Sequence, residues 1–368
     1  MKKNIVRIGL LGSIVLTGIS FPIVANAGYV FSELKPLAGG SRSMAFGINN
    51  LGQVVGTTDF NAPCMGCGGY TRATFWDGTT TATELRTPGT SGYAYDINDM
   101  GQVAGYEHYS YSSHTNAVIW NNGVPSALTT LSGRPSIANA INSVGQVLGN
   151  GLAGSTTGTA VVWSAGAATI YLGANSSASD INDVGQVAGR LNEAPTVWRS
   201  ATPTALGTLD GGYAVTEAIN NAGQVVGWSS TRNGSYHATL WTDTDAIDLG
   251  TLGGTSYAQG INDEGIVVGE SYDADGVLRA FLWDGKVMRD LNNLLDPVVA
   301  DTGWHLIDAY DINDSGQIVG RARNTTTGDV HSYLLTPDSF SVPEPDSYQL
   351  MLAGLGLLAL RGKRRQPM

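Results

Sequence analysis

A nine-residue pattern of alternating apolar and polar positions recurs along most of the chain. It first reads Ile-Asn-Asn-Leu-Gly-Gln-Val-Val-Gly at residues 48–56 and returns six times with small changes. The seven copies begin at Ile48, Ile97, Ile141, Ile181, Ile219, Ile261 and Ile312, at a mean spacing of 44 residues. Periods of this length are typical of repeat architectures, in which each unit needs its neighbours to bury its apolar surface.

Each copy predicts a β-hairpin. A first strand ends in Ile-Asn, a turn of the form Asn/Asp-x-Gly follows, and a second strand begins with Gln-Val or a close variant. The turn glycine suits a left-handed backbone position, and the Asn or Asp before it can bond the turn amides. These glycines are Gly52, Gly101, Gly145, Gly185, Gly223, Gly265 and Gly316.

Two more strands complete each unit. The third strand ends in Trp in six of the units, and we expect these side chains in the blade cores: Trp76, Trp120, Trp163, Trp198, Trp241 and Trp283. Turns such as Asp77-Gly78 then lead into a fourth strand, which the pattern places most plainly at residues 248–254. Four strands in about 44 residues fit one propeller blade.

The two ends of the repeat region complement each other. Residues 34–40 read as a fourth strand with no unit before it, and the seventh unit stops at a third strand around Tyr333. An N-terminal strand that completes the last blade accounts for both observations. The sequence therefore predicts an all-β, seven-bladed β-propeller of four-stranded repeats, closed by an N-terminal strand. An open β-repeat stack is the alternative.

Composition agrees with this fold and restricts the partners. The 368 residues include 49 glycines, and only 14% are charged, which favours short strands and tight turns over coiled coils. The net charge is -11 overall and -16 for residues 28–341, which carry 13 basic and 29 acidic groups. Such a body repels phosphate backbones, so we expect no nucleic acid as a partner.

The N-terminus has the pattern of a secretory signal peptide over residues 1–27. A basic start at Lys2, Lys3 and Arg7 precedes an apolar run, and the small residues Ala25 and Ala27 form a cleavage site. An uncleaved membrane anchor is the alternative. Residues 28–341 are then the exported propeller domain.

The C-terminus, residues 342–368, combines a stiff spacer, an apolar stretch at 350–360 and a basic end. The residues that define the spacer and the basic end are Val342, Pro343, Glu344, Pro345, Arg361, Lys363, Arg364 and Arg365. The basic end stays cytoplasmic by the positive-inside bias, and eleven apolar residues are short for a permanent span. The arrangement resembles the PEP-CTERM sorting signal, which implies a short transmembrane helix, transient anchoring in the inner membrane and an exosortase-type sorting enzyme as partner. An ordinary C-terminal anchor is the alternative.

The repeats themselves resemble the HAF repeats of exported bacterial proteins. The resemblance rests on His-Ala-Thr-Leu-Trp at residues 237–241 and on residues 248–254, although most units lack the His. It implies an extracellular repeat protein and brings no catalytic residues.

Local motifs give few candidate residues for disulfide formation, metal binding or redox chemistry. In an exported protein Cys64 and Cys67 are expected to form a disulfide, whereas metal or redox work would need further ligands. The sequence segments that begin at Asp96, Asp180 and Asp311 superficially resemble calcium loops, but their fifth position is Met, Val or Ser in place of the expected carboxylate or amide ligand. We interpret them as hairpin turns, and we interpret residues 273–276 as a tight turn. No metal or other cofactor is expected.

These observations favour a non-enzymatic binding or structural component of the cell envelope, exopolysaccharide or biofilm matrix. Trp228 and Trp304 lie outside the repeated Trp positions and are candidates for an exposed binding surface. The alternative is a secreted propeller enzyme, a hydrolase or lyase acting on extracellular polysaccharide or small esters, with its site at the channel mouth. Four acids that recur around the predicted ring could converge there: Asp99, Asp183, Asp263 and Asp314.

Overall fold

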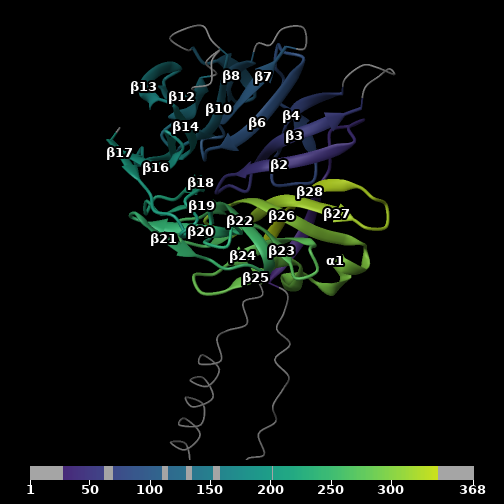
Figure 1. Ribbon diagram of the computed structural model, residues 1–368. Helices are drawn as coiled ribbons and strands as arrows, with labels where there is room; N and C mark the ends of the chain where they lie inside the picture. Colours follow the sequence, from purple (N-terminus) through teal and green to yellow (C-terminus); the bar gives the residue numbers. More distant parts are fainter. Residues whose placement is uncertain are drawn as a thin grey trace, which may run out of the picture.

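The structure, a computed structural model, describes residues 28–61, 69–109, 115–129, 135–151, 158–200 and 202–338. In these residues the strands form seven four-stranded antiparallel sheets, arranged around a common centre (Figure 1). The predicted seven-bladed β-propeller is confirmed. Within a blade the strands follow chain order from the innermost to the outermost, except where the N-terminus completes the ring.

The first four blades follow one another without interruption. Blade 1 comprises β2 (Arg42–Ile48), β3 (Val54–Phe60), β4 (Tyr70–Trp76) and β5 (Ala82–Glu84). Blade 2 comprises β6 (Ser91–Ile97), β7 (Val103–His108), β8 (Thr115–Asn121) and β9 (Val124–Ala127). Blade 3 comprises β10 (Ser136–Ile141), β11 (Val147–Gly151), β12 (Thr159–Ser164) and β13 (Ala167–Ala174). Blade 4 comprises β14 (Ser176–Ile181), β15 (Val187–Leu191), β16 (Ala194–Arg199) and β17 (Thr202–Ala205).

The last three blades include the only helices of the described residues. Blade 5 comprises β18 (Ala214–Ile219), β19 (Val225–Ser230), β20 (Tyr236–Thr242) and β21 (Asp245–Asp248). Blade 6 comprises β22 (Gly253–Ile261), β23 (Val267–Asp273), β24 (Leu278–Trp283) and β25 (Met288–Asp290). A 3-10 turn, η1 (Leu291–Leu294), and α1 (Pro297–Asp301) lead into blade 7. Blade 7 comprises β26 (Trp304–Ile312), β27 (Ile318–Asn324) and β28 (Val330–Pro337), with β1 (Tyr29–Leu34) as its outermost strand.

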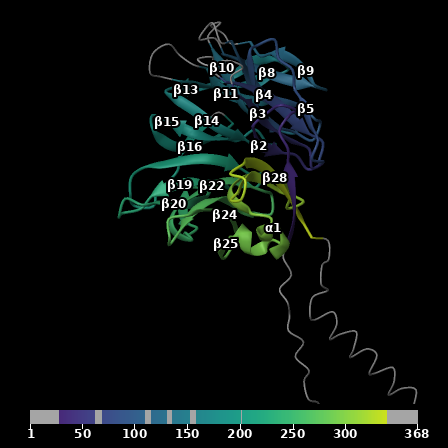
Figure 2. The same ribbon diagram turned by 90° about the vertical axis from the view of Figure 1, so that its right-hand side faces the viewer.

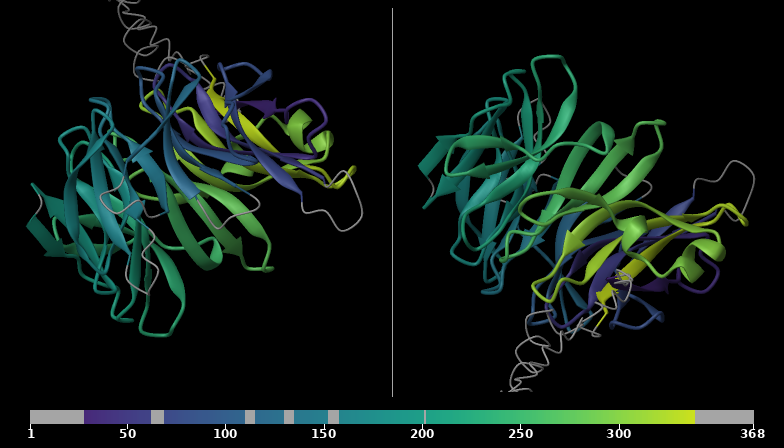
Figure 3. Two further views of the ribbon diagram at one scale, coloured as in Figure 1. Left: turned by 90° about the horizontal axis from the view of Figure 1, so that it is seen from above. Right: turned by 90° about the horizontal axis from the view of Figure 1, so that it is seen from below.

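The N-terminal strand closes the ring. β1 pairs antiparallel with β28, so that Tyr29 lies opposite Pro337 and Leu34 opposite Ser332 (Figure 2). The backbone N–H of Asp338 donates to the carbonyl oxygen of Gly28 at 2.9 Å, which brings the two ends of the described chain together (Figure 3). Closure by an N-terminal strand is confirmed, and β28 has a partner on its outer edge.

The exact placement of the fourth strands was wrong. The closing strand is β1, which ends at Leu34 where the predicted segment 34–40 begins, and β21 ends at Asp248 where the predicted segment 248–254 begins. Leu249 and Leu34 are buried among residues of the next blade. In these two blades the apolar signal at the end of the fourth strand therefore comes from a Leu that fills the core between blades.

The blade cores contain the repeated Trp side chains, as predicted for five of the six. These five are at most 1% exposed, and Trp163 packs in a cluster that joins blades 2 and 3. Trp283 is only partly buried. In blade 6 the fully buried Phe281 fills the space over the second strand instead.

A ring of seven buried Asn side chains joins all the blades at one end of the channel. Each Asn follows the first strand, and its side-chain Nδ2 donates to the backbone carbonyl of the equivalent Asn in the next blade at 2.9–3.2 Å. This asparagine ring consists of Asn49, Asn98, Asn142, Asn182, Asn220, Asn262 and Asn313. Its last bond, from Asn313 to Asn49, crosses the seam between blades 7 and 1. The repeated Asn thus both caps its own turn and ties neighbouring blades together.

Candidate functional site

Every first strand carries a β-bulge three residues before the asparagine ring. The bulge leaves one residue of the first strand without an opposite partner on the second strand. These residues form the bulge ring: Phe46, Tyr95, Asn139, Ser179, Glu217, Gln259 and Tyr310. Since the first strands are innermost and contact one another around the ring, the bulges direct these side chains into the central channel.

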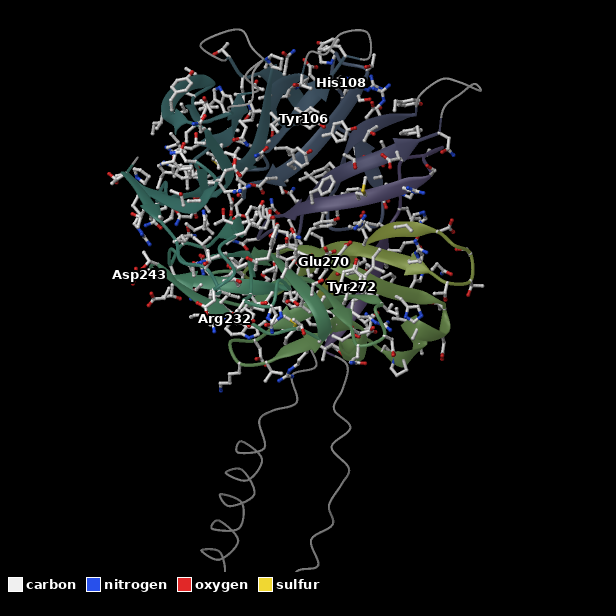
Figure 4. The ribbon with its side chains drawn as sticks, in the orientation of Figure 1. Tyr106, His108, Arg232, Asp243, Glu270 and Tyr272 are labelled. Carbon is white, nitrogen blue, oxygen red and sulfur yellow. The ribbon has the colours of Figure 1, made fainter. Side chains whose placement is uncertain are left out.

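A second layer of the channel wall comes from the second strands. Each second strand has a Gly so close to the bulged strand that a methyl group there would lie 1.9–2.2 Å from a carbonyl oxygen. The residue after that Gly belongs to the second ring: Thr57, Tyr106, Asn150, Arg190, Trp228, Glu270 and Arg321. Tyr106 and Glu270 are labelled in Figure 4. The repeats thus keep the backbone constant and vary the side chains at these two positions.

Residues of blades 2 to 5 line an open cavity of about 410 Å³ in this wall. It is lined by Tyr95 and Asn139, by residues of β14 and β18 that include Ser179 and Glu217, and by Arg190. The Arg190 guanidinium lies over the Tyr213 ring at 4.9 Å, and its Nη2 donates to the Glu193 carboxylate at 2.6 Å. Among the described residues the Arg190 Nε is buried without a hydrogen-bond partner.

An aromatic cluster contacts two residues of the cavity lining, Glu217 and Arg190, on the blade 5 side. The Trp228 ring contacts the rings of Tyr213, Tyr236 and Tyr257 at centroid distances of 4.9–5.5 Å. Trp228 also hydrogen-bonds the side chain of Glu217. Burial raises the pKa of Glu217 to about 7, although the bond from Trp228 acts in the opposite direction. A carboxyl group that changes charge near neutral pH therefore lies beside aromatic faces, which is a combination suited to sugars.

Blades 6 and 7 line the channel with a charged network. The fully buried Asp308 forms an ion pair with Arg321, whose Nε donates to it at 2.7 Å. The Arg321 guanidinium also lies over the Tyr310 ring at 5.4 Å. Burial, together with the charge of Asp308, raises the pKa of Glu270 to about 7. Arg321 is paired with Asp308. On this side of the channel these two opposite charges therefore fix each other's position.

Three Asp side chains next to the bulges link neighbouring blades. Asp96 accepts hydrogen bonds from its neighbour Ile97 and, at 2.7 Å, from the backbone N–H of Ile141 in the next blade. Asp180 and Asp311 make the equivalent bonds. Burial raises the pKa of Asp96 to about 7 and that of Asp180 to about 6, and it raises the pKa of Asp311 well above its ordinary value. Mutual repulsion of the carboxylates contributes for Asp96 and Asp311.

The hairpin turns surround the channel mouth beside the asparagine ring. A hollow of about 170 Å³ there is lined by the Ile-Asn-x triplets of all seven blades. The four recurrent acids do converge on it, in exposed positions: Asp99, Asp183, Asp263 and Asp314. They accept bonds from the backbone N–H groups of neighbouring turns, such as Asn50 N–H to Asp99 at 2.8 Å. Their regular role is to join turn to turn.

The segments that begin at Asp96, Asp180 and Asp311 form hairpin turns, as interpreted from the sequence. Asn98 Oδ1 accepts from the backbone N–H of Gln102, and Gly101 has a positive φ of 72°. Residues 273–276 form the expected tight turn, closed by a bond from the Gly276 N–H to the Asp273 carbonyl. Within the described ranges, no group of three or more His, Cys, Asp or Glu side chains is arranged to hold a metal ion.

The two unrepeated Trp residues have different surroundings. Trp228 bonds Glu217 of the cavity lining and is partly buried among tyrosines. Trp304 packs against Phe31 and His331 in blade 7. His331 in turn bonds the Glu33 carboxylate of the closing strand at 2.6 Å. Trp304 therefore packs against the closing strand of blade 7, and of these two residues only Trp228 lies next to the candidate site.

Several sequence predictions concern residues outside the described ranges. These are the signal peptide at 1–27, the disulfide between Cys64 and Cys67, and the sorting segment at 342–368 with its apolar stretch. In the part of the chain that the structure describes, no helix has the length and apolar character to span a bilayer.

The bulge ring and the second ring were missed because the residue types at these positions vary among the repeats. A motif search looks for what recurs, whereas these positions vary inside a constant framework. Aligning the seven repeats with one another would have marked them, since the residue two before each Ile changes from Phe46 to Glu217 to Tyr310.

Comparison with known proteins addresses the C-terminus and the fold separately. Residues 341–365 match the PEP-CTERM protein-sorting motif. This signal indicates an exported protein that is sorted to the surface, with exosortase as the enzyme that recognises the motif. No curated protein matches the chain.

Solved structures share the fold at low identity. The β-propeller domain of the Trilobed protease from Pyrococcus furiosus aligns with a TM-score of 0.57 and 11% identity, over 82% of this chain and 96% of that one. The Pyrococcus horikoshii acylaminoacyl peptidase aligns with a TM-score of 0.53 and 12% identity, over 82% of this chain and about half (53%) of the peptidase. The first is described as having an open velcro topology, whereas β1 closes the ring here. At these identities the likeness concerns the fold alone.

Proposed function

We propose that this exported protein is a non-enzymatic, glycan-binding component of the cell envelope, exopolysaccharide or biofilm matrix, and that the cavity of blades 2 to 5 is its binding site. The cavity carries the proposal, because it combines the Tyr95 ring, hydroxyl and amide groups, and the charged Arg190 side chain. Aromatic faces with a few placed polar groups are how proteins hold sugars and similar ligands.

A secreted hydrolase or lyase is the second candidate, favoured by the Glu217 carboxyl. Its pKa of about 7 suits a proton donor. Glycoside hydrolysis, however, ordinarily uses a pair of carboxyl groups, and Glu217 is the one acid among the described residues that line the cavity. The lining residues that the structure describes include no His either. These features support binding over catalysis.

Binding should respond to both the aromatic wall and pH. Using exopolysaccharide fragments from the native host and calorimetry on the full chain, we expect Tyr95→Ala to weaken binding about tenfold. A bound sugar displaces water and so favours the neutral form of Glu217; binding is therefore tighter at about pH 6 than at about pH 8. Glu217→Gln should remove this difference.

Tyr272→Ala is the matched control, since Tyr272 is an exposed tyrosine on the outer part of β23. Equal losses in the Tyr95 and Tyr272 variants would refute the site. Release of new reducing ends or unsaturated sugars during the incubation would instead support the enzyme.

The sorting proposal has its own test. We propose that the segment 342–368 anchors the protein transiently and is then removed near Val342 to Pro345. Mass spectrometry of surface material from the native host should find the body without residues 350–360. Recovery of intact protein through Met368 in that fraction would identify the segment as a permanent anchor.

A further inference from the structure

The tips of four successive hairpin turns are exposed and apolar. Leu51, Met100, Val144 and Val184 occupy the same turn position in blades 1 to 4, and their side chains are 57–70% exposed. In blades 5 to 7 this position holds Ala222, Glu264 and Ser315. Single exposed apolar residues are ordinary, but four at one structural position form a continuous feature.

These tips lie on one connected surface, which we call the hairpin face. Neighbouring turns are hydrogen-bonded to each other, as Ser143 N–H is to Asp183 at 2.8 Å. The Met100 methyl group also lies 3.7 Å from the position that a methyl group on Gly145 would take, so the tips of blades 2 and 3 adjoin. The apolar arc therefore extends over about half of the ring of turns.

The described chain leaves the propeller at this same face. Gln317, which follows the blade 7 turn, donates from its side chain to Thr336, and the Pro337 ring lies 3.3 Å from where a methyl group on Gly316 would be. Asp338 is the last described residue, and the apolar stretch of the sorting segment begins at Leu350. Twelve residues span at most about 40 Å, so an anchored chain holds the hairpin face close to the membrane.

The charges of this face select the kind of membrane. The turn tips include the exposed carboxylates of Asp99, Asp183, Asp263 and Asp314, and no Lys or Arg stands at either tip position of the seven turns. Attraction to anionic lipid is therefore absent from this contact, and apolar insertion is what remains.

We propose that the hairpin face rests on the lipid bilayer while the C-terminal segment is anchored, with the side chains of Leu51, Met100, Val144 and Val184 entering the interface. The inference rests on the proposed anchoring. In this orientation the end of the propeller opposite the hairpin face points away from the membrane. Removal of the sorting segment then frees the body, because four partly exposed apolar side chains alone hold it weakly.

The test is photolabelling of the full chain, reconstituted in phosphatidylcholine vesicles that contain a diazirine-bearing phosphatidylcholine. Mass spectrometry should find label on peptides that contain residues 49–53, 98–102, 142–146 and 182–186, and little on the turn around Val277 at the opposite end of blade 6. Adding anionic phosphatidylglycerol should reduce the labelling. Equal labelling of both ends of the blades would overturn the proposal, and so would stronger labelling with anionic lipid.

Matched double variants separate lipid contact from other causes. Val144→Ser with Val184→Ser should reduce the labelling of the turn peptides at least about threefold, whereas Val277→Ser with Val298→Ser should not change it. Label on the 350–360 peptide alone would leave the anchoring intact and refute the resting face; no label on either would refute the anchoring. If the turn residues instead became less accessible as the protein concentration increased without lipid, the hairpin face would bind a second copy of the chain and the proposal would be overturned.

Discussion

Gly105→Ala is expected to destabilise the propeller by about 3 kcal/mol or more, or to prevent folding of the full chain. A methyl group at Gly105 would lie 1.9 Å from the Tyr93 carbonyl oxygen and 3.0 Å from the Trp120 ring. Backbone atoms cannot yield as a flexible side chain can, so the bulge that directs Tyr95 into the channel would have to shift. Thermal and urea unfolding of the purified protein measure the loss.

Gly151→Ala is the control for this prediction. Its methyl group would lie 3.6 Å from the nearest atom, the Thr159 carbonyl oxygen, which is ordinary contact. We expect a change within about 1 kcal/mol at this position. If Gly105→Ala melted within the error of the parent protein, the close approach of the first two strands would not be a real constraint.

Acidification from about pH 8 to about pH 5 should raise the melting temperature by about 5 °C or more. Burial raises the pKa of Asp96 and Glu217 to about 7, whereas the unfolded chain loses these protons near pH 4. The folded state therefore binds more protons between these values, and stability rises as the pH falls. Asp77 and Asp273 have lowered pKa values and cost stability only below about pH 4.

Asp96→Ala tests the origin of this effect. The chain itself uses Ala at the equivalent positions of blades 3 and 5, Ala140 and Ala218, so the backbone tolerates the substitution. Differential scanning calorimetry across the pH range should show a flatter profile in the variant. A melting temperature of the parent that falls steadily on acidification would contradict the assignment of raised pKa values to the channel carboxyl groups.

The repeat pattern predicted the architecture because its signals are local. The repeated nine-residue pattern predicts a turn that contains a Gly with positive φ and an Asn whose side chain caps the turn. Both features are present in every blade. The complementary ends predicted closure. The register of the fourth strands was wrong because burial of Leu34 and Leu249 between blades gives the same apolar pattern as a strand. Sequence alone does not separate a side chain that plugs a core from one that belongs to a sheet.

The candidate site was much harder to predict. The alternative enzyme hypothesis allowed the recurrent acids to converge at a channel mouth; they do lie together there, but their oxygens are used between turns. The cavity depends on bulges in the first strands, which place Tyr95 and Glu217 in one space although they are more than a hundred residues apart. Trp228 stood out from the sequence, yet its bond to Glu217 depends on the bulge in β18 and its contact with Tyr257 depends on blades 5 and 6 meeting. The resemblance to HAF repeats stays a prediction.

Hydroxyl-radical footprinting of the full chain, with and without exopolysaccharide fragments from the native host, tests the proposed binding site most directly. We expect the ligand to protect Tyr95, which lines the cavity, and Trp228, which bonds Glu217 of its lining, and to leave Tyr272 unchanged. Protection confined to the outer strands, with Tyr95 and Trp228 oxidised as fast as in the free protein, would contradict it.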